Sequence, residues 1–179
     1  MILKKCLLGL LLVVNSLVLN ATDKIPSKAA SKRGASTPPI ISPYLKFADD
    51  IQRYAKKFIG TRYVYGGKAP KGFDCSGFVG YVFAKCGIKF DMRSSELAKV
   101  GYEICVPDAL PGDLVFFRRS TNPRSPVSHV GIVVEYSTRG LKFIHATHGK
   151  GVTISYLPEK YYTNHFVGVR RVIDTFKNF

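Results

Sequence analysis

The spacing of hydrophobic residues changes part-way along this chain, and that change constrains the fold more than any other feature. Apolar residues recur at helical spacing over residues 44–60, and a second helical run follows over residues 75–86. Beyond residue 112, five segments have the composition of β-strands, with turns between them: residues 113–117, 129–136, 141–147, 151–157 and 166–173. This order predicts an α+β fold, with N-terminal helices packed on an antiparallel sheet of about five to six strands.

The second helical run carries one continuous apolar stripe, and both of its ends are marked. Asp74 suits the N-cap position, and Gly87 suits the position after the C-cap. A short further helical piece is expected near residues 94–100. The stripe has residues at i, i+3, i+4, i+7, i+8 and i+11, namely Cys75, Phe78, Val79, Val82, Phe83 and Cys86. Cys75 is therefore predicted to lie in the first helical turn.

The first 21 residues have the layout of a secretory signal peptide. Lys4 and Lys5 precede an apolar run over residues 7–14, and the segment finishes on the small residue Ala21. Polar residues interrupt this stretch before it reaches the ~20 apolar residues that a membrane span needs. We therefore expect an exported protein, periplasmic or secreted, that keeps no stable membrane span after the leader is removed.

The remaining chain divides into an arm and one domain. Residues 22–43 are rich in Ser, Ala, Lys and Pro and lack hydrophobic periodicity, which predicts a flexible linker or arm. Residues 44–179 then form one domain that is large enough to bury its own core. The mature chain keeps Cys75, Cys86 and Cys105, an odd number for an oxidising compartment. Two alternatives stay open: Cys86 and Cys105 form a disulfide, or both are thiols.

The chain is strongly basic. Its formal charge is +15, and removal of Lys4 and Lys5 with the leader leaves +13. Nucleic acid is the usual partner for such a charge, but the leader and the lack of a nucleic-acid-binding motif argue against it. We expect an anionic cell envelope as the partner, and the alternative is a basic surface without a functional role.

Cys75 is a candidate nucleophile because of its place in the predicted helix. The thiolate is the reactive form, and the N–H groups and dipole at a helix N-terminus favour the anion, so this position is expected to lower the thiol pKa. A cysteine on an apolar helical stripe is also a common core residue. The nucleophile hypothesis therefore requires a base nearby.

His129 and His145 can supply that base. They lie on neighbouring predicted strands, and the residue numbers of opposed positions in an antiparallel pair have a constant sum. If that sum is even, both histidines share one face and lie about 5 to 8 Å apart at Cβ. Two such histidines beside Cys75 would complete a nucleophile, base and orienting group. A zinc site is the competing interpretation, but no C-x-x-C or H-x-x-x-H spacing is present. His148 and His165 are expected on the surface.

Several blocks of the chain resemble the NlpC/P60 family of bacterial cell-wall cysteine peptidases. They stand in the family's order and cover about residues 45–173: "GTRYVYGG", "GFDCSGFVGYVF", "RSS", "LPGDLVFF", "SHVGIVV", "FIHAT" and "GVTISYL". The resemblance implies a papain-like fold in which Cys75 is the nucleophile, His129 its base and His145 the residue that orients His129. It also implies that the hydroxyl of Tyr63 lies near the sulfur and assists the oxyanion site.

The resemblance further implies a substrate and its binding residues. Asp74 and Ser76 match positions that border the substrate peptide, and Arg93 and Ser94 match a segment beside the groove. The implied reaction is hydrolysis of peptidoglycan stem peptides, often between γ-D-glutamyl and a diamino acid, without metal or cofactor. Two alternatives stay open: an amidase or acyl transferase with the same triad, and a non-catalytic wall-binding protein.

Overall fold

A six-stranded antiparallel sheet forms the centre of the protein, in a computed structural model that describes residues 43–176. The strand order is β3-β8-β4-β5-β6-β7, and every neighbouring pair is antiparallel. The strands are β3 (Tyr102–Ile104), β4 (Leu114–Arg118), β5 (Val127–Ser137), β6 (Gly140–Thr147), β7 (Gly151–Tyr156) and β8 (Phe166–Arg171). The predicted α+β class and strand number are confirmed.

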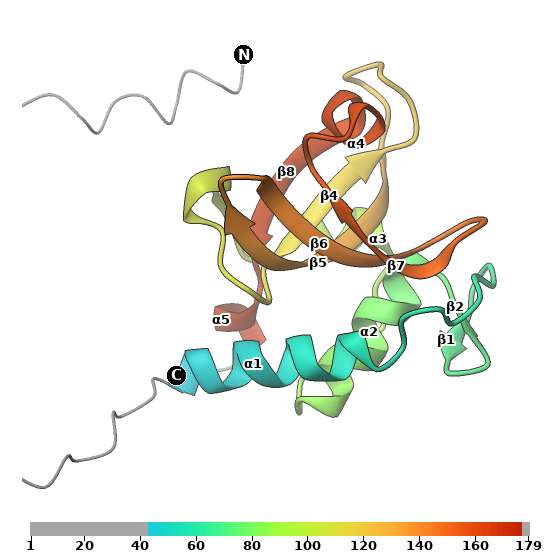
Figure 1. Ribbon diagram of the computed structural model, residues 1–179, viewed down its shortest axis with the longest axis vertical. Helices are drawn as coiled ribbons and strands as arrows, with labels where there is room; N and C mark the ends of the chain where they lie inside the picture. The colour runs from blue at the N-terminus through green and yellow to red at the C-terminus, as the bar shows by residue number, and fades with distance from the viewer. Residues whose placement is uncertain (1–42, 177–179) are drawn as a thin grey trace, which may run out of the picture. The chain divides into compact units, whose positions relative to one another are not determined.

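The two predicted N-terminal helices lie on one side of this sheet (Figure 1). Helix α1 spans Pro43–Lys56 and packs on α2, which spans Cys75–Lys85 and contacts β5 and β6. A two-stranded hairpin, β1 (Lys68–Ala69) and β2 (Gly72–Phe73), lies between them in the chain. The short helix α3 (Ser94–Leu97) follows α2 and also contacts β5. The predicted helical regions are thus confirmed, each with a shorter C-terminal end.

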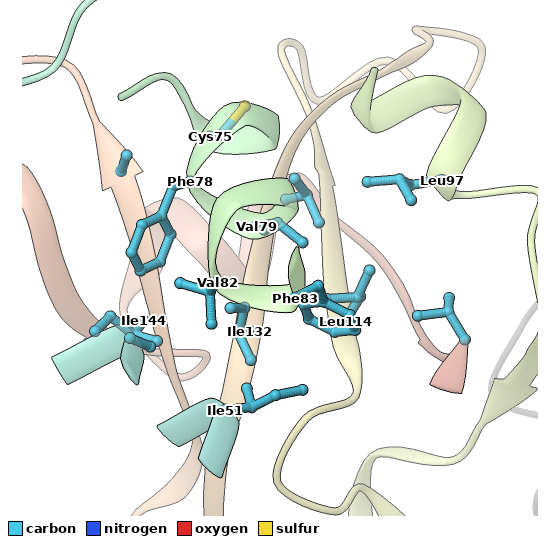
Figure 2. Packing of buried hydrophobic residues seen from close by; sticks show 14 of the residues in the cluster. Ile51, Cys75, Phe78, Val79, Val82, Phe83, Leu97, Leu114, Ile132 and Ile144 are labelled. Carbon is cyan, nitrogen blue, oxygen red and sulfur yellow. The ribbon is translucent and has the colours of Figure 1, made fainter. Parts of the chain in front are cut away.

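Strand alternation gives the sheet a hydrophobic core on each face. Val130, Ile132 and Ile144 face the helices and join the cluster built on α1 and α2 (Figure 2). Phe117 and Phe143 belong to a second cluster on the opposite face. Successive strand residues point to opposite faces. Near residue 129, the even-numbered residues therefore point to the face covered by the helices, and the odd-numbered residues point to the opposite face. His129 is odd-numbered, and its ring lies beside that of Phe117, 6.0 Å away between centroids.

Helix α4 (Lys160–His165) and strand β3 were not predicted from the sequence. Tyr162 of α4 is buried in the second cluster, although its segment has little hydrophobic periodicity. Strand β3 has only three residues, none of them fully buried, so it lacks a period-2 pattern and is recognised only through its pairing with β8. The remaining short elements are the 3₁₀ helix η1 (Val106–Asp108) and α5 (Ile173–Phe176).

Some expectations fall outside the described residues. The predicted leader, residues 1–21, and nearly all of the predicted arm precede residue 43. Within residues 43–176, no helix combines the length and the apolar character that a membrane crossing requires. Among the described residues, Cys86 is not disulfide-bonded, so the possible Cys86–Cys105 disulfide is not formed.

Candidate active site

Cys75 occupies the first turn of α2, as predicted. Asp74 is the N-cap residue, and its Oδ1 accepts hydrogen bonds from the Gly77 amide at 2.6 Å and the Ser76 hydroxyl at 3.1 Å. Its Oδ2 accepts from the Gly66 amide at 2.9 Å, which ties the preceding loop to the helix start. Figure 2 shows Cys75 at one end of the α2 cluster, beyond Phe78. Asp74 therefore fixes the backbone on both sides of the cysteine.

The sulfur of Cys75 lies against the start of β5. The thiol donates to the carbonyl oxygen of Ser128 at 3.9 Å, and the Val130 amide hydrogen-bonds the sulfur. These two backbone groups belong to the residues on either side of His129. The register of β4 and β5 shifts between Phe117 and Arg118, where β5 contains one extra residue. Such bulges bend a strand and redirect its side chains, and they are frequent beside active sites.

The protonation state of Cys75 differs from the expectation. Burial and the nearby Asp74 carboxylate raise the pKa of the thiol to about 11, although the amides of Val130 and Ser76 act in the opposite direction. The prediction that the helix N-terminus leaves Cys75 with a lowered pKa is therefore wrong. Only 8% of Cys75 is exposed, and the loss of solvation outweighs the stabilisation by N–H groups. The resting group is a thiol.

The two histidines form a direct pair on one face of the sheet. Opposed residues of β5 and β6 have an even sum near the site, as in the pair of Ile132 with Ile144, so the predicted shared face is confirmed. His129 Nε2 and His145 Nδ1 are 2.7 Å apart. Gly131 makes room for this pair, because a Cβ at Gly131 would lie 3.2 Å from His145 Cβ and 2.8 Å from the Phe143 ring.

Both histidines are neutral in this environment. Burial lowers the pKa of His129 to about 4. Burial also lowers the pKa of His145 to about 3, with smaller contributions from the charges of His129 and Lys150. His145 is completely buried, whereas His129 is partly buried. The pair therefore shares one N–H between two neutral rings across its 2.7 Å contact.

A groove of about 1100 Å³ runs over the start of α2 and contains most of the predicted site. Lys68, Asp91 and Ser128 also line it. Among the described residues, the lining stops at Ser128 and does not include the rings of His129 and His145. The groove thus brings together the cysteine and the residues predicted to contact substrate, namely Tyr63, Asp74, Cys75, Ser76, Arg93 and Ser94.

Tyr63 and Arg93 are both held at the edge of this groove. Tyr63 forms an isolated bridge with Phe73, and burial and the neighbouring Cys75 raise the pKa of its hydroxyl, which stays protonated. Arg93 is the exposed N-cap residue of α3, where its amide donates to Glu96 Oε2 at 2.7 Å. Ser94 is nearly buried in the first turn of α3. The Arg93 guanidinium is therefore carried on a fixed backbone.

Two polar residues beside the histidine pair were not identified from the sequence. Ser155 of β7 and Tyr162 of α4 both have hydroxyl oxygens within 3.2 Å of His145 Nε2. The only sequence signal was a serine at an alternating position of a predicted strand. Among residues 43–176, no group of three or more His, Cys, Asp or Glu is arranged to hold a metal ion.

Comparison with known proteins decides the family. The model of the NlpC/P60 family matches residues 60–171, which is more than half of the chain. The chain belongs to the NlpC/P60 family. Its match to this family includes every predicted site residue from Tyr63 to His145, and it covers the groove, α2 and the strands β4 to β8.

Individual NlpC/P60 proteins resemble parts of the chain. It is 41% identical over 123 residues to the gamma-DL-glutamyl hydrolase of Bacillus subtilis, covering 68% of this chain and 28% of that protein. It is 36% identical over 118 residues to a probable endopeptidase NlpC homolog of Haemophilus influenzae, covering 65% of this chain and 58% of that protein. The chain therefore spans less than two thirds of both relatives.

A solved structure supports the same assignment of the fold. The NlpC/p60 domain of the peptidoglycan hydrolase SagA matches with a TM-score of 0.57 and 30% identity. The match covers 69% of this chain and 97% of that domain. The α+β arrangement described above is therefore the fold of an NlpC/P60 domain.

Proposed function

We propose that the protein is a cysteine peptidase that hydrolyses peptide bonds in peptidoglycan stem peptides or cross-links. The bond between γ-D-glutamyl and a diamino acid is the preferred target. The observation that carries the proposal is the position of Cys75: its sulfur lines a groove and contacts the backbone on both sides of His129. The proposal is supported by the names of a gamma-DL-glutamyl hydrolase, a probable endopeptidase and a peptidoglycan hydrolase domain among the similar proteins.

In the proposed mechanism, His129 removes the proton of Cys75 as the sulfur attacks. His129 Nε2 is engaged by His145, which leaves Nδ1 as the nitrogen that accepts the thiol proton. Since the resting pair is a neutral thiol and a neutral imidazole, proton transfer accompanies attack on the scissile carbonyl. His129 then passes the proton to the leaving amine, and water hydrolyses the acyl-enzyme.

The oxyanion that forms during attack requires hydrogen-bond donors. Backbone N–H groups at the start of α2 and the protonated hydroxyl of Tyr63 line the groove beside the sulfur. Removing one donor of this kind from an oxyanion hole costs about 10²- to 10³-fold in kcat. Asp74, Ser76, Arg93 and Ser94 offer charged and polar groups to the peptide in the same groove. The proposal also includes export of the protein and its attraction to an anionic cell envelope.

The test is digestion of purified peptidoglycan and of a synthetic γ-D-glutamyl-diamino acid peptide, followed by mass spectrometry. We expect cleavage after the γ-D-glutamyl residue and none by Cys75→Ala. Cys86→Ala is the matched control, because Cys86 lies at the other end of α2 and outside the groove lining, and it should keep its activity. Release of complete stem peptides from the sugar would instead indicate the amidase. Hydrolysis by folded Cys75→Ala would refute the proposal.

A further inference from the structure

The far side of His145 contacts two buried hydroxyl groups. His145 Nε2 lies 3.2 Å from Ser155 Oγ and 3.2 Å from the Tyr162 hydroxyl. Ser155 also donates to the Tyr162 oxygen at 3.2 Å, so the three groups form a closed triangle. The exposed fractions are 0% for His145, 4% for Ser155 and 8% for Tyr162. In such a dry environment, an N–H without an acceptor is destabilising.

The position of one proton determines whether His129 can act as a base. A neutral imidazole carries a single N–H, and the other nitrogen is an acceptor. For His129 Nδ1 to accept the thiol proton, the N–H of His129 must be on Nε2 and must donate to His145 Nδ1. His145 must then carry its own proton on Nε2. The opposite tautomer of His145 would direct an N–H at His129 Nε2 and force the proton of His129 onto Nδ1.

The two hydroxyl groups provide acceptors at the place where this proton is required. Because the proton of Ser155 is donated to Tyr162, the Ser155 oxygen keeps its lone pairs for the N–H of His145. The Tyr162 oxygen lies at the same distance, and it accepts as well when its own O–H points out of the triangle. Its ring is fixed by Phe117 and Phe143, with centroids 5.2 Å and 4.9 Å away. The hydroxyl is therefore held by packing as well as by hydrogen bonds.

We propose that Ser155 and Tyr162 are positioning residues, which accept the Nε2–H of His145 and so keep Nδ1 of His129 available as the base. Neither residue touches the groove, and both act through the histidine pair. This proposal rests on the proposed function for its catalytic meaning. The tautomer of His145, however, is a property of the resting protein and is measured without any substrate.

The variants are Ser155→Ala, Tyr162→Phe and the double substitution. Tyr162→Phe removes one oxygen and keeps the packed ring, and Ser155→Thr should restore activity because it keeps a hydroxyl. Tyr161→Phe is the matched control, since Tyr161 is the neighbouring residue of α4 and its side chain is exposed. We expect each single variant to lose roughly 2- to 5-fold in kcat with KM unchanged, as for one hydrogen bond. The double variant should lose more than the product of the two.

The deciding measurement is the histidine tautomer, from long-range ¹H–¹⁵N correlation spectra of ¹⁵N-histidine-labelled protein. Wild type should show His145 protonated at Nε2, and the double variant should show a population protonated at Nδ1. Wild-type protein with its His145 proton on Nδ1 would overturn the proposal. A double variant with wild-type kcat and wild-type tautomer would also overturn it. If peptidoglycan is not hydrolysed at all, the proposed function fails while the spectra still report the tautomer.

Discussion

Cys75 is a thiol and His129 a neutral imidazole at rest, and the state of the thiol has a measurable consequence for its reactivity. Burial raises the pKa of Cys75 to about 11, so below that pH the thiolate fraction rises tenfold per pH unit. The rate of alkylation by iodoacetamide should rise in the same way from pH 6 to pH 10. Peptide mapping separates Cys75 from Cys86, which serves as the internal reference. A rate that is already on a plateau at neutral pH would indicate a preformed thiolate–imidazolium pair.

The acid side of the activity profile reports His129. A base must be neutral to accept a proton, and burial lowers the pKa of His129 to about 4. The group is therefore neutral above about pH 5, and kcat/KM should stay constant from pH 7 down to that value. We expect the decline only at lower pH, in an assay on a soluble muropeptide. An acid limb near 6.5, the value of an unperturbed histidine, would contradict the burial argument.

The two histidines should tolerate substitution differently. Asparagine can make the fixed hydrogen bond of His145 but cannot serve as a base near neutral pH. His145→Asn should therefore keep more activity than His145→Ala, whereas His129→Asn should be as inactive as His129→Ala, about 10²- to 10⁴-fold below wild type. Circular dichroism confirms folding before the assay. Greater activity in His129→Asn than in His145→Asn would reverse the two roles.

Sequence reasoning predicted where the candidate site residues lie but not their surroundings. The positions of Cys75, His129 and His145 could be predicted, because helical stripes and strand alternation fix which face a side chain occupies. The raised pKa of Cys75 could not be predicted. Desolvation depends on what packs over the helix start, and no local sequence pattern reveals this. Tyr162 reaches His145 through tertiary packing of α4, a helix that local spacing did not reveal.

At the scale of elements, a buried ion pair holds the turn before β4 against β8. Asp113 is completely buried and accepts from Arg171 Nε at 2.8 Å, from a second Arg171 nitrogen at 2.9 Å and from the Leu110 amide at 2.9 Å. The Arg171 guanidinium also lies 5.4 Å from the ring centroid of Tyr44. This one carboxylate therefore connects the turn, the strand β8 and helix α1.

Removing the carboxylate should destabilise the whole fold. Asp113→Ala leaves a partly buried arginine and a turn amide without their acceptor, and we expect a loss of about 3–5 kcal/mol in the free energy of unfolding. Glu103→Ala is the matched control, because Glu103 pairs with the adjacent Arg170 at 3.7 Å and is 84% exposed. It should lose less than about 1 kcal/mol. Urea denaturation measures the free energy of unfolding of both variants. Equal losses would show that burial does not determine how much these ion pairs stabilise the fold.

The elements that could be predicted carry a local signal in the sequence. Helices α1 and α2 have apolar residues at helical spacing, and strands β4 to β8 have the composition of β-strands between turns. The register bulge of β5 at the site has no such signal, since one extra residue changes the pairing without changing the composition. Its position is decided by the fit between β4 and β5.

At the scale of the molecule, the site joins the two faces of the sheet. Cys75 belongs to the core of the helical face, whereas the groups around His145 belong to the core of the other face. They meet at the bulge of β5, where the backbone of Ser128 and Val130 contacts the sulfur. Because each side chain is fixed by a separate core, packing of both cores sets the distance between Cys75 and His129.

The net charge, +15 for the whole chain and +13 without Lys4 and Lys5 of the predicted leader, should govern association with the wall and leave the chemistry unaffected. Attraction between a basic protein and an anionic polymer acts through solvent, where the Debye length falls to a few ångströms at ~0.5 M salt. Binding of inactive Cys75→Ala to insoluble peptidoglycan should therefore weaken strongly between low salt and ~0.5 M salt in a sedimentation assay. Hydrolysis of an uncharged soluble peptide by wild type should change little over the same range, because Cys75 and His145 are buried from the salt. Binding that does not depend on salt would show that the charge is incidental, since screening removes only the electrostatic part of the attraction.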